Sequence, residues 1–291
     1  NAKTYDGTTD VTGTGFSDNR VNSDVLTFDY STVFASKHAG AGKLVNYSGI
    51  TISGGAGANN YTLLTTSGTA SATISQRPVN VTAVTDTKIY DGSNSSDELP
   101  VVGNLQTGDL VTSVGTQLFD NANAGTSKVL TPSGTVISDG NSGANYAISY
   151  VTSSTGVITA KELTVSNAAV TTKIYDGNTT AAVSGATLSG TVGSDDVVLE
   201  NNTSGTLASA SVGTHSVTTT PMTISGTKAA NYSLTQPILS GEVTAKPITG
   251  NFTADNKVYD RNVTATVLTR SLNGVVPIDA GQVSLTGGTA T

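Results

Sequence analysis

One short motif returns at a nearly fixed spacing along this chain. Its form is Lys-x-Tyr-Asp-Gly in three copies and Lys-Val-Tyr-Asp-Arg in the fourth, and successive tyrosines are 85, 85 and 84 residues apart. The motif residues are Tyr5, Asp6, Gly7, Tyr90, Asp91, Gly92, Tyr175, Asp176, Gly177, Tyr259 and Asp260. A fixed period of this kind predicts a tandem array, in which every copy is one structural unit and contacts its neighbours.

Other landmarks keep the same register as the motif. A second tyrosine follows the first by 56, 56 and 57 residues, at Tyr61, Tyr146 and Tyr232. The asparagine before it, at Asn60, Asn145 and Asn231, is expected in a turn. An aspartate precedes a strand-like run at Asp24, Asp109 and Asp196. We therefore predict domains at residues 1–76 (truncated at its start), 77–160, 161–245 and 246–291 (partial).

The pattern of apolar residues is that of β-strands. Apolar and polar residues alternate in 79–82, 146–150 and 163–166, and clusters of Gly, Asn, Asp and Ser separate such runs. This alternation predicts strands with one face toward a core. Only a few residues join one predicted domain to the next, and Pro78 and Pro247 restrict two of the joints. We expect an all-β tandem array of domains of about 85 residues, forming an elongated, semi-rigid rod.

Composition argues against several classes of function. The chain of 291 residues has 14 basic and 21 acidic residues, a net charge of −7, and no clustered basic residues that would bind nucleic acid. It has no cysteine, which excludes a scaffold built on disulfides. No apolar run is long enough for a transmembrane helix, so we expect no membrane insertion. With two histidines and no nucleophile motif, we expect no enzyme and no catalytic residue. We also expect no metal site or cofactor, with weak Ca²⁺ binding at a domain joint left open as an alternative.

The repeated motif is best explained as a folding device. The aspartate can accept hydrogen bonds from the backbone two residues on, and the glycine permits a positive φ. The tyrosine offers a large apolar body and a hydroxyl that can cap a carbonyl. The lysine two residues before each tyrosine is interpreted as an edge-strand charge, with a covalent amide crosslink to Asn or Asp as the alternative. Arg261 predicts a right-handed or strained turn in the fourth copy.

Three aromatic residues occur in the first copy without counterparts in the others. These are Phe28, Tyr30 and Tyr47. Aromatic side chains beside Asp or Asn are the usual ingredients of a sugar site, so these residues are the candidate ligand-binding set. A third possibility for the chain is lateral self-association through exposed edge strands, giving an extracellular filament or sheath.

The combination of Lys-x-Tyr-Asp-Gly, Gly-Ala-Asn-Tyr and a closing strand near Lys/Arg-Pro resembles the YDG repeats of large bacterial adhesins. Such repeats occur in filamentous haemagglutinin-like proteins of two-partner secretion. The resemblance implies small β-sandwich or β-grasp-like domains in a secreted or outer-surface protein of a Gram-negative bacterium. It implies a stalk or fibre segment for adhesion or biofilm. The partners of the full-length protein would be other cells, matrix polysaccharide or host glycans.

Small-angle X-ray scattering can test the expected rod. A compact globule of this length would have a radius of gyration of roughly 19 Å. Short joints between consecutive domains should give a value well above that. A measured radius near the compact value would contradict the rod.

Overall fold

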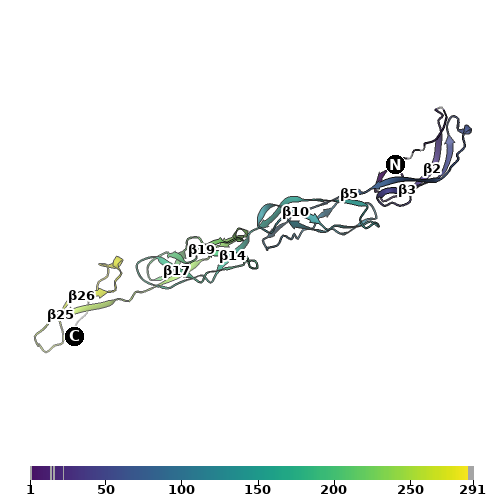
Figure 1. The fold of residues 1–291 in the computed structure, drawn as a ribbon. Coiled ribbons are helices and arrows are strands. Elements are labelled where there is room, and N and C mark those ends of the chain that lie inside the picture. Colours follow the sequence, from purple (N-terminus) through teal and green to yellow (C-terminus); the bar gives the residue numbers. More distant parts are fainter. Residues whose placement is uncertain (1, 14, 16, 22, 288–291) are drawn as a thin grey trace. The chain divides into compact units, whose positions relative to one another are not determined.

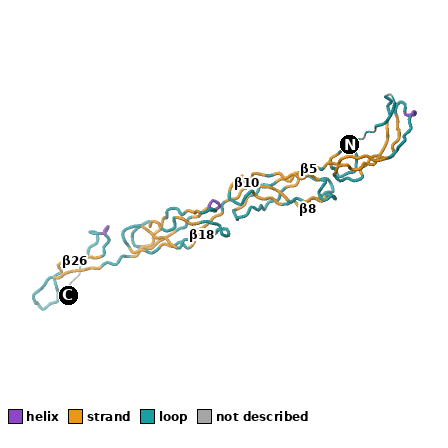
Figure 2. The backbone as a smooth tube through the Cα atoms, in the orientation of Figure 1, coloured by secondary structure: helices purple, strands orange, loops and turns teal. Residues whose placement is uncertain are grey.

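The structure is a computed structural model that describes residues 2–13, 15, 17–21 and 23–287. The chain is nearly all β, as predicted, with short helical turns between curled sheets of small β domains (Figure 2). Its contacts divide it into two compact units. The first consists of Asn1–Ile89 and Ser93–Thr159, and the second of Tyr90–Gly92 and Ala160–Thr291.

The first unit contains the first two predicted domains except for Tyr90–Gly92 and Ala160. The strands of residues 1–76 form one four-stranded sheet in the order β1-β4-β3-β2, in which β2 and β3 make a long hairpin (Figure 1). Residues 77–160 form sheets β6-β13-β10-β9, β12-β5-β7 and β11-β8. The elements are β1 (Lys3–Thr4), β2 (Thr27–Phe34), β3 (Gly40–Gly54), η1 (Ala58–Asn60), β4 (Gly68–Ser75), β5 (Arg77–Thr82), β6 (Thr87–Ile89), β7 (Val101–Val102), β8 (Leu110–Ser113), β9 (Thr116–Phe119), β10 (Gly125–Ser133), β11 (Val136–Ser138), β12 (Tyr146–Val151) and β13 (Ser153–Thr159).

The second unit repeats this plan in residues 161–245. Its sheets are β18-β14-β23, β15-β17-β20-β21-β24-β16 and β19-β22, and the hairpin β25-β26 follows in residues 246–291. The elements are β14 (Lys161–Ser166), β15 (Ala169–Val170), β16 (Lys173–Ile174), β17 (Thr180–Ser184), β18 (Thr187–Ser189), β19 (Val198–Glu200), β20 (Ser204–Leu207), β21 (Gly213–Thr218), β22 (Thr223–Ser225), η2 (Ala229–Asn231), β23 (Tyr232–Thr235), β24 (Leu239–Thr244), β25 (Thr249–Ala254), β26 (Val267–Asn273) and η3 (Pro277–Asp279).

Two parallel strand pairs place both tyrosines of the repeat at a domain joint. In the first domain, β1 runs parallel to β4 with Thr4 opposite Ser75, so the next residue, Tyr5, lies at the end of the domain. In the second domain, β12 runs parallel to β5 with Tyr146 opposite Arg77. Because Ser75 and Arg77 are two residues apart in the chain, Tyr5 and Tyr146 meet at the joint.

The apolar core of the first unit is continuous across this joint. Phe34, Val45 and Ile74 from the first domain belong to the same buried cluster as Val79 and Ile137 from the second, and both joint tyrosines are members of it. Domains of this size bury only a modest core of their own. A shared core therefore supplies apolar burial that neither domain provides alone.

Candidate functional site: the tyrosine joints

The turn after the motif tyrosine is held by its aspartate at Asp6, Asp176 and Asp260. Oδ1 of Asp6 accepts the backbone N–H of Thr8 at 2.9 Å, and Asp176 and Asp260 accept the N–H of the residue two positions on in the same way. The residue after the aspartate has a positive φ in all four copies, with φ of 79° at Gly7 and 64° at Arg261. The fourth turn therefore takes the left-handed form at a non-glycine residue, which is the strained alternative of the two predicted for Arg261.

The motif lysine braces the turn that follows it. Nζ of Lys3 donates to Asp6 Oδ1 and to the Thr8 carbonyl, both at 2.9 Å, and its side chain is 5% exposed. Lys173 makes the matching ion pair with Asp176 at 2.8 Å, and the resulting hydrogen bond holds the pKa of that carboxyl below its ordinary value. Lys3 and Lys173 lie on the edge strands β1 and β16, as interpreted, and the charge of each is paired within the turn. Lys173 Nζ also donates to the side-chain oxygen of Asn178 at 2.7 Å.

The motif tyrosine binds a carboxylate in the next domain, not a carbonyl near its own turn. The Tyr5 hydroxyl donates to Asp109 Oδ2 at 3.0 Å, and the Tyr146 hydroxyl donates to the same oxygen at 2.7 Å. The two rings pack edge to face, with centroids 5.6 Å apart at 76°. The Gln106 N–H donates to the Tyr146 hydroxyl at 2.8 Å. One carboxylate thus holds two phenols, one from each side of the joint.

The second unit contains the same arrangement. The hydroxyls of Tyr90 and Tyr232 donate to Asp195 Oδ2 at 2.8 Å and 2.6 Å, and the ring centroids are 5.3 Å apart. The N–H of Val192 donates to the Tyr232 hydroxyl at 2.9 Å. The sequence analysis grouped Asp196 with Asp24 and Asp109, but the residue that corresponds to Asp109 in the structure is Asp195. Asp195 accepts both phenols, and Asp196 instead accepts the N–H and hydroxyl of Thr227, 3.0 Å and 3.1 Å away.

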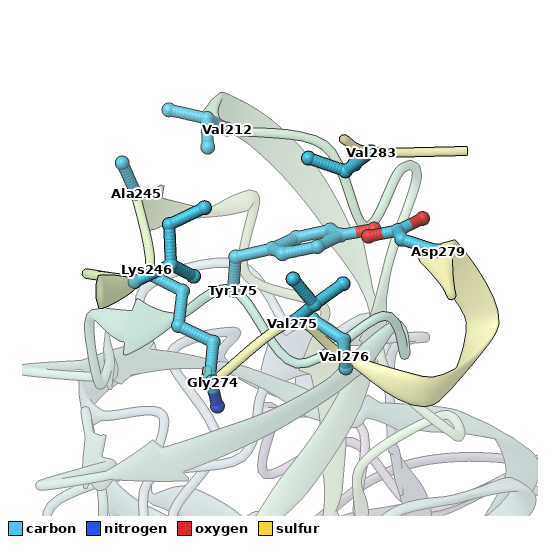
Figure 3. A pocket seen from close by; sticks show the side chains of 10 residues that line it. Tyr175, Val212, Ala245, Lys246, Gly274, Val275, Val276, Asp279 and Val283 are labelled. Carbon is cyan, nitrogen blue, oxygen red and sulfur yellow. The ribbon is translucent and has the colours of Figure 1, made fainter. Parts of the chain in front are cut away.

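A third arrangement joins residues 161–245 to the partial fourth domain. Tyr175 points toward Asp279 (Figure 3), and this hydrogen bond, with a smaller contribution from burial, raises the pKa of Tyr175 above its ordinary value. A pocket of about 160 Å³ lies beside the pair, walled on other sides by Val212, Val276 and Val283.

The motif tyrosines differ in how far they are buried. Tyr5 and Tyr90, which face complete domains, are 0% and 2% exposed. Tyr175 faces the partial domain and is half-buried, and Tyr259 is 85% exposed. The tyrosine is therefore a plug shared by two domains, since Tyr5 lies in one buried cluster with Ile74 of its own domain and Val79 of the next.

The asparagine before the second tyrosine contributes to the joint as well as to its own turn. Asn145 is fully buried, and its Oδ1 accepts the N–H of Ala39 from the first domain at 2.9 Å. Its own N–H donates to Asp139 Oδ2. Burial raises the pKa of Asp139, but three backbone N–H donors outweigh burial and hold it below its ordinary value. A turn residue was predicted at Asn145, while its contact with the preceding domain was not.

The candidate sugar-binding residues are only partly brought together. Phe28 and Tyr47 line a pocket of about 190 Å³ with Asp18 and Leu63, among others, and Tyr30 is not among its lining residues. The guanidinium of Arg20, which pairs with Asp18, lies 5.8 Å from the centre of the Phe28 ring. The Tyr47 ring covers Gly68, where an added Cβ would lie 2.3 Å from the phenol oxygen.

Among the residues that the structure describes, no group of three or more His, Cys, Asp or Glu side chains is placed to hold a metal ion. No helix in the described part of the chain has the length and apolar character to cross a membrane.

These observations define a tandem-repeat β protein whose repeats are joined by buried tyrosines. Comparison with protein families matches the YDG domain at residues 1–70, 75–154 and 159–238. The chain belongs to the YDG domain family. Comparison with curated proteins finds no match.

The joints predict a loss of stability at alkaline pH. Burial first, and then the hydrogen bond to the carboxylate, raises the pKa of Tyr5 and Tyr90 from 10.0 to about 12, and Tyr146 is raised to the same value. A pKa raised in the folded state favours the neutral phenol, so this stabilisation is complete below pH 10 and is lost as the pH rises toward 12. We expect the thermal unfolding midpoint to fall across that interval.

The matched variants are Tyr5→Phe, which removes a joint hydroxyl, and Tyr30→Phe, which removes one outside the joints. Tyr5→Phe should destabilise the protein by about 1–2 kcal/mol near neutral pH and should weaken the alkaline dependence. Equal alkaline profiles for wild type and Tyr5→Phe would contradict the assignment.

Proposed function

We propose that this chain is a structural stalk or fibre segment of a bacterial cell-surface or secreted adhesin, used for adhesion or biofilm. The proposal rests on one observation: the hydroxyls of the buried Tyr5 and Tyr90 each donate to a carboxylate in the following repeat. A buried contact shared by neighbours resists bending and separation far better than a Gly/Ser linker does. A segment that must hold other parts of a protein away from a cell surface needs such joints.

Several features support a stalk over a ligand-binding or catalytic role. The polar groups that recur in every repeat are used within the turns and joints, as with Lys3 and Asp6 or with Tyr5 and Asp109. These polar groups therefore stabilise the fold and the contact between neighbouring repeats. Membership in the YDG domain family agrees with this, since the resemblance noted above is to the repeat regions of large adhesins. In this proposal, cells, matrix polysaccharide or host glycans are bound by other parts of the full-length protein.

Removal of one repeat from the protein that carries this segment tests the proposal. Deletion of residues 77–160 brings the Tyr5 plug opposite the Asp195–Tyr232 pair, so a joint of the same type can form. We expect normal surface expression and reduced attachment of cells under flow, because the reach is shorter. The double substitution Phe28→Ala with Tyr47→Ala should leave attachment unchanged. The reverse pattern would show that the segment binds a ligand directly.

A second candidate function is carbohydrate binding by the first repeat. It is favoured by the pocket that brings Phe28 and Tyr47 together with the Asp18 carboxylate, since an aromatic face beside a carboxylate is a common sugar-binding pair. A glycan array probed with the purified chain tests it. Binding to particular glycans that is lost in the Phe28→Ala, Tyr47→Ala variant would support this function, and a blank array with folded protein would remove it.

A further inference from the structure

The first and last strands of a complete repeat lie side by side and run in the same direction. In the second repeat, β5 pairs parallel with β12, with Arg77 opposite Tyr146, and β6 pairs parallel with β13, with Ile89 opposite Thr159. In the third repeat, β14 pairs parallel with β23, and β16 pairs parallel with β24. The chain therefore enters a repeat at one end of these pairs and leaves it at the other end.

Backbone hydrogen bonds connect the two parallel pairs of the second repeat. The N–H of Ala83, just after β5, donates to the Val151 carbonyl at 2.9 Å. The N–H of Val157 in β13 donates to the carbonyl of Asp86, just before β6, also at 2.9 Å. The pairs β5–β12 and β6–β13 are thus parts of one longer contact between the beginning and the end of the repeat.

Pro78 lies within β5 and yet leaves this contact intact. The N–H groups of Arg77 and Ala83 both donate to carbonyls in residues 145–151. Because neighbouring residues of a strand direct their backbone groups to opposite sides, the residues between them alternate in the same way. The carbonyl of Asn80 accordingly accepts a hydrogen bond from the residue after β7, on the other side of β5. The proline therefore stands where an N–H directed at β12 is not needed.

The paired strands also contribute to the apolar core. Val79 and Val81 of β5 and Ile158 of β13 are buried, as are Leu163 of β14 and Val243 of β24 in the third repeat. Separation of the strands would expose these side chains to water together with the backbone groups that the hydrogen bonds satisfy. Both changes cost free energy, so the contact between the first and last strands is one of the more stable parts of the repeat.

We propose that these parallel pairs make each complete repeat a load-bearing element that resists tension applied along the chain. Tension pulls the entering strand and the leaving strand past each other in opposite directions. All hydrogen bonds between two such strands then carry the load together, whereas the bonds of a pair that is pulled apart from one end break one after another. The inference concerns the strength of a single repeat and does not depend on the proposed stalk function.

Single-molecule force spectroscopy on the full chain tests the proposal. Because the chain has no cysteine, two introduced cysteines supply defined attachment points. Ser75→Cys with Ala160→Cys loads the second repeat along its parallel pairs. Ser75→Cys with Ala144→Cys loads it across one end, since both positions precede the Arg77–Tyr146 pair. All three substituted residues are exposed. We expect a several-fold higher rupture force when the load runs along the pairs.

Two controls separate this effect from changes in fold or in the joint. Forced unfolding depends on the unfolding rate, so both cysteine variants should keep the thermal unfolding midpoint of the wild type while their rupture forces differ. The length released on rupture, roughly 3.3–3.6 Å for each residue between the attachment points, identifies the segment that has opened. Addition of Tyr5→Phe to both variants should preserve the difference in force. A difference that disappears with Tyr5→Phe would assign the strength to the joint and overturn the proposal.

The two complete repeats should also differ in strength. The parallel pairs of the second repeat contain six and three opposed residue pairs, and those of the third contain four and two. Ala160→Cys with Ala245→Cys, which alters two exposed residues, loads the third repeat along its pairs. We expect this variant to rupture at a lower force than the second repeat does. A higher force for the third repeat, or equal forces for the two loading directions of the second, would overturn the proposal.

Discussion

A phenol hydroxyl that crosses from one repeat to a carboxylate in the next is the contact on which this architecture depends. A buried tyrosine removes roughly 150–250 Å² from water, worth about 4–6 kcal/mol as an upper estimate. That is comparable with the whole stability of a small domain. The Tyr5 ring also belongs to a cluster that includes Ile74 of one repeat and Val79 of the next. Neighbouring repeats therefore stabilise one another, and a repeat without its neighbour would lose a large part of its core.

The joint also gives the array a direction. The plug lies at the end of the parallel pair β1–β4, and the second tyrosine lies beside the first residue of the following repeat. The hydroxyls of Tyr5 and Tyr90 record this direction, because each donates to a carboxylate in the repeat after its own. A directional joint of this kind can be repeated from one repeat to the next.

Much of the fold could be predicted because it depends on local patterns. Alternating residues gave the strand class, and the Asp-Gly pair indicated the turn that Asp6 and Gly7 form. The site was harder to predict. Tyr5 binds Asp109, which is 104 residues away, and no local rule selects that partner. Asp195 and Asp196 are adjacent and identical in type, and only the backbone trace decides which side chain faces the tyrosines. The hydrogen bond from Ala39 to Asn145 could not be predicted either, because the two residues are far apart in the sequence.

The sequence by itself determined the number and spacing of the repeats, their β character and the turn at each Tyr-Asp-Gly motif. Those features depend on the period, on alternation and on the backbone preferences of Asp and Gly, all of which act within a few residues. The tertiary structure alone decided what the tyrosine does. Parallel pairing of short strands brings the ends of two repeats together at Ser75 and Arg77. A hydroxyl that must be desolvated takes its partner from whatever that pairing places beside it.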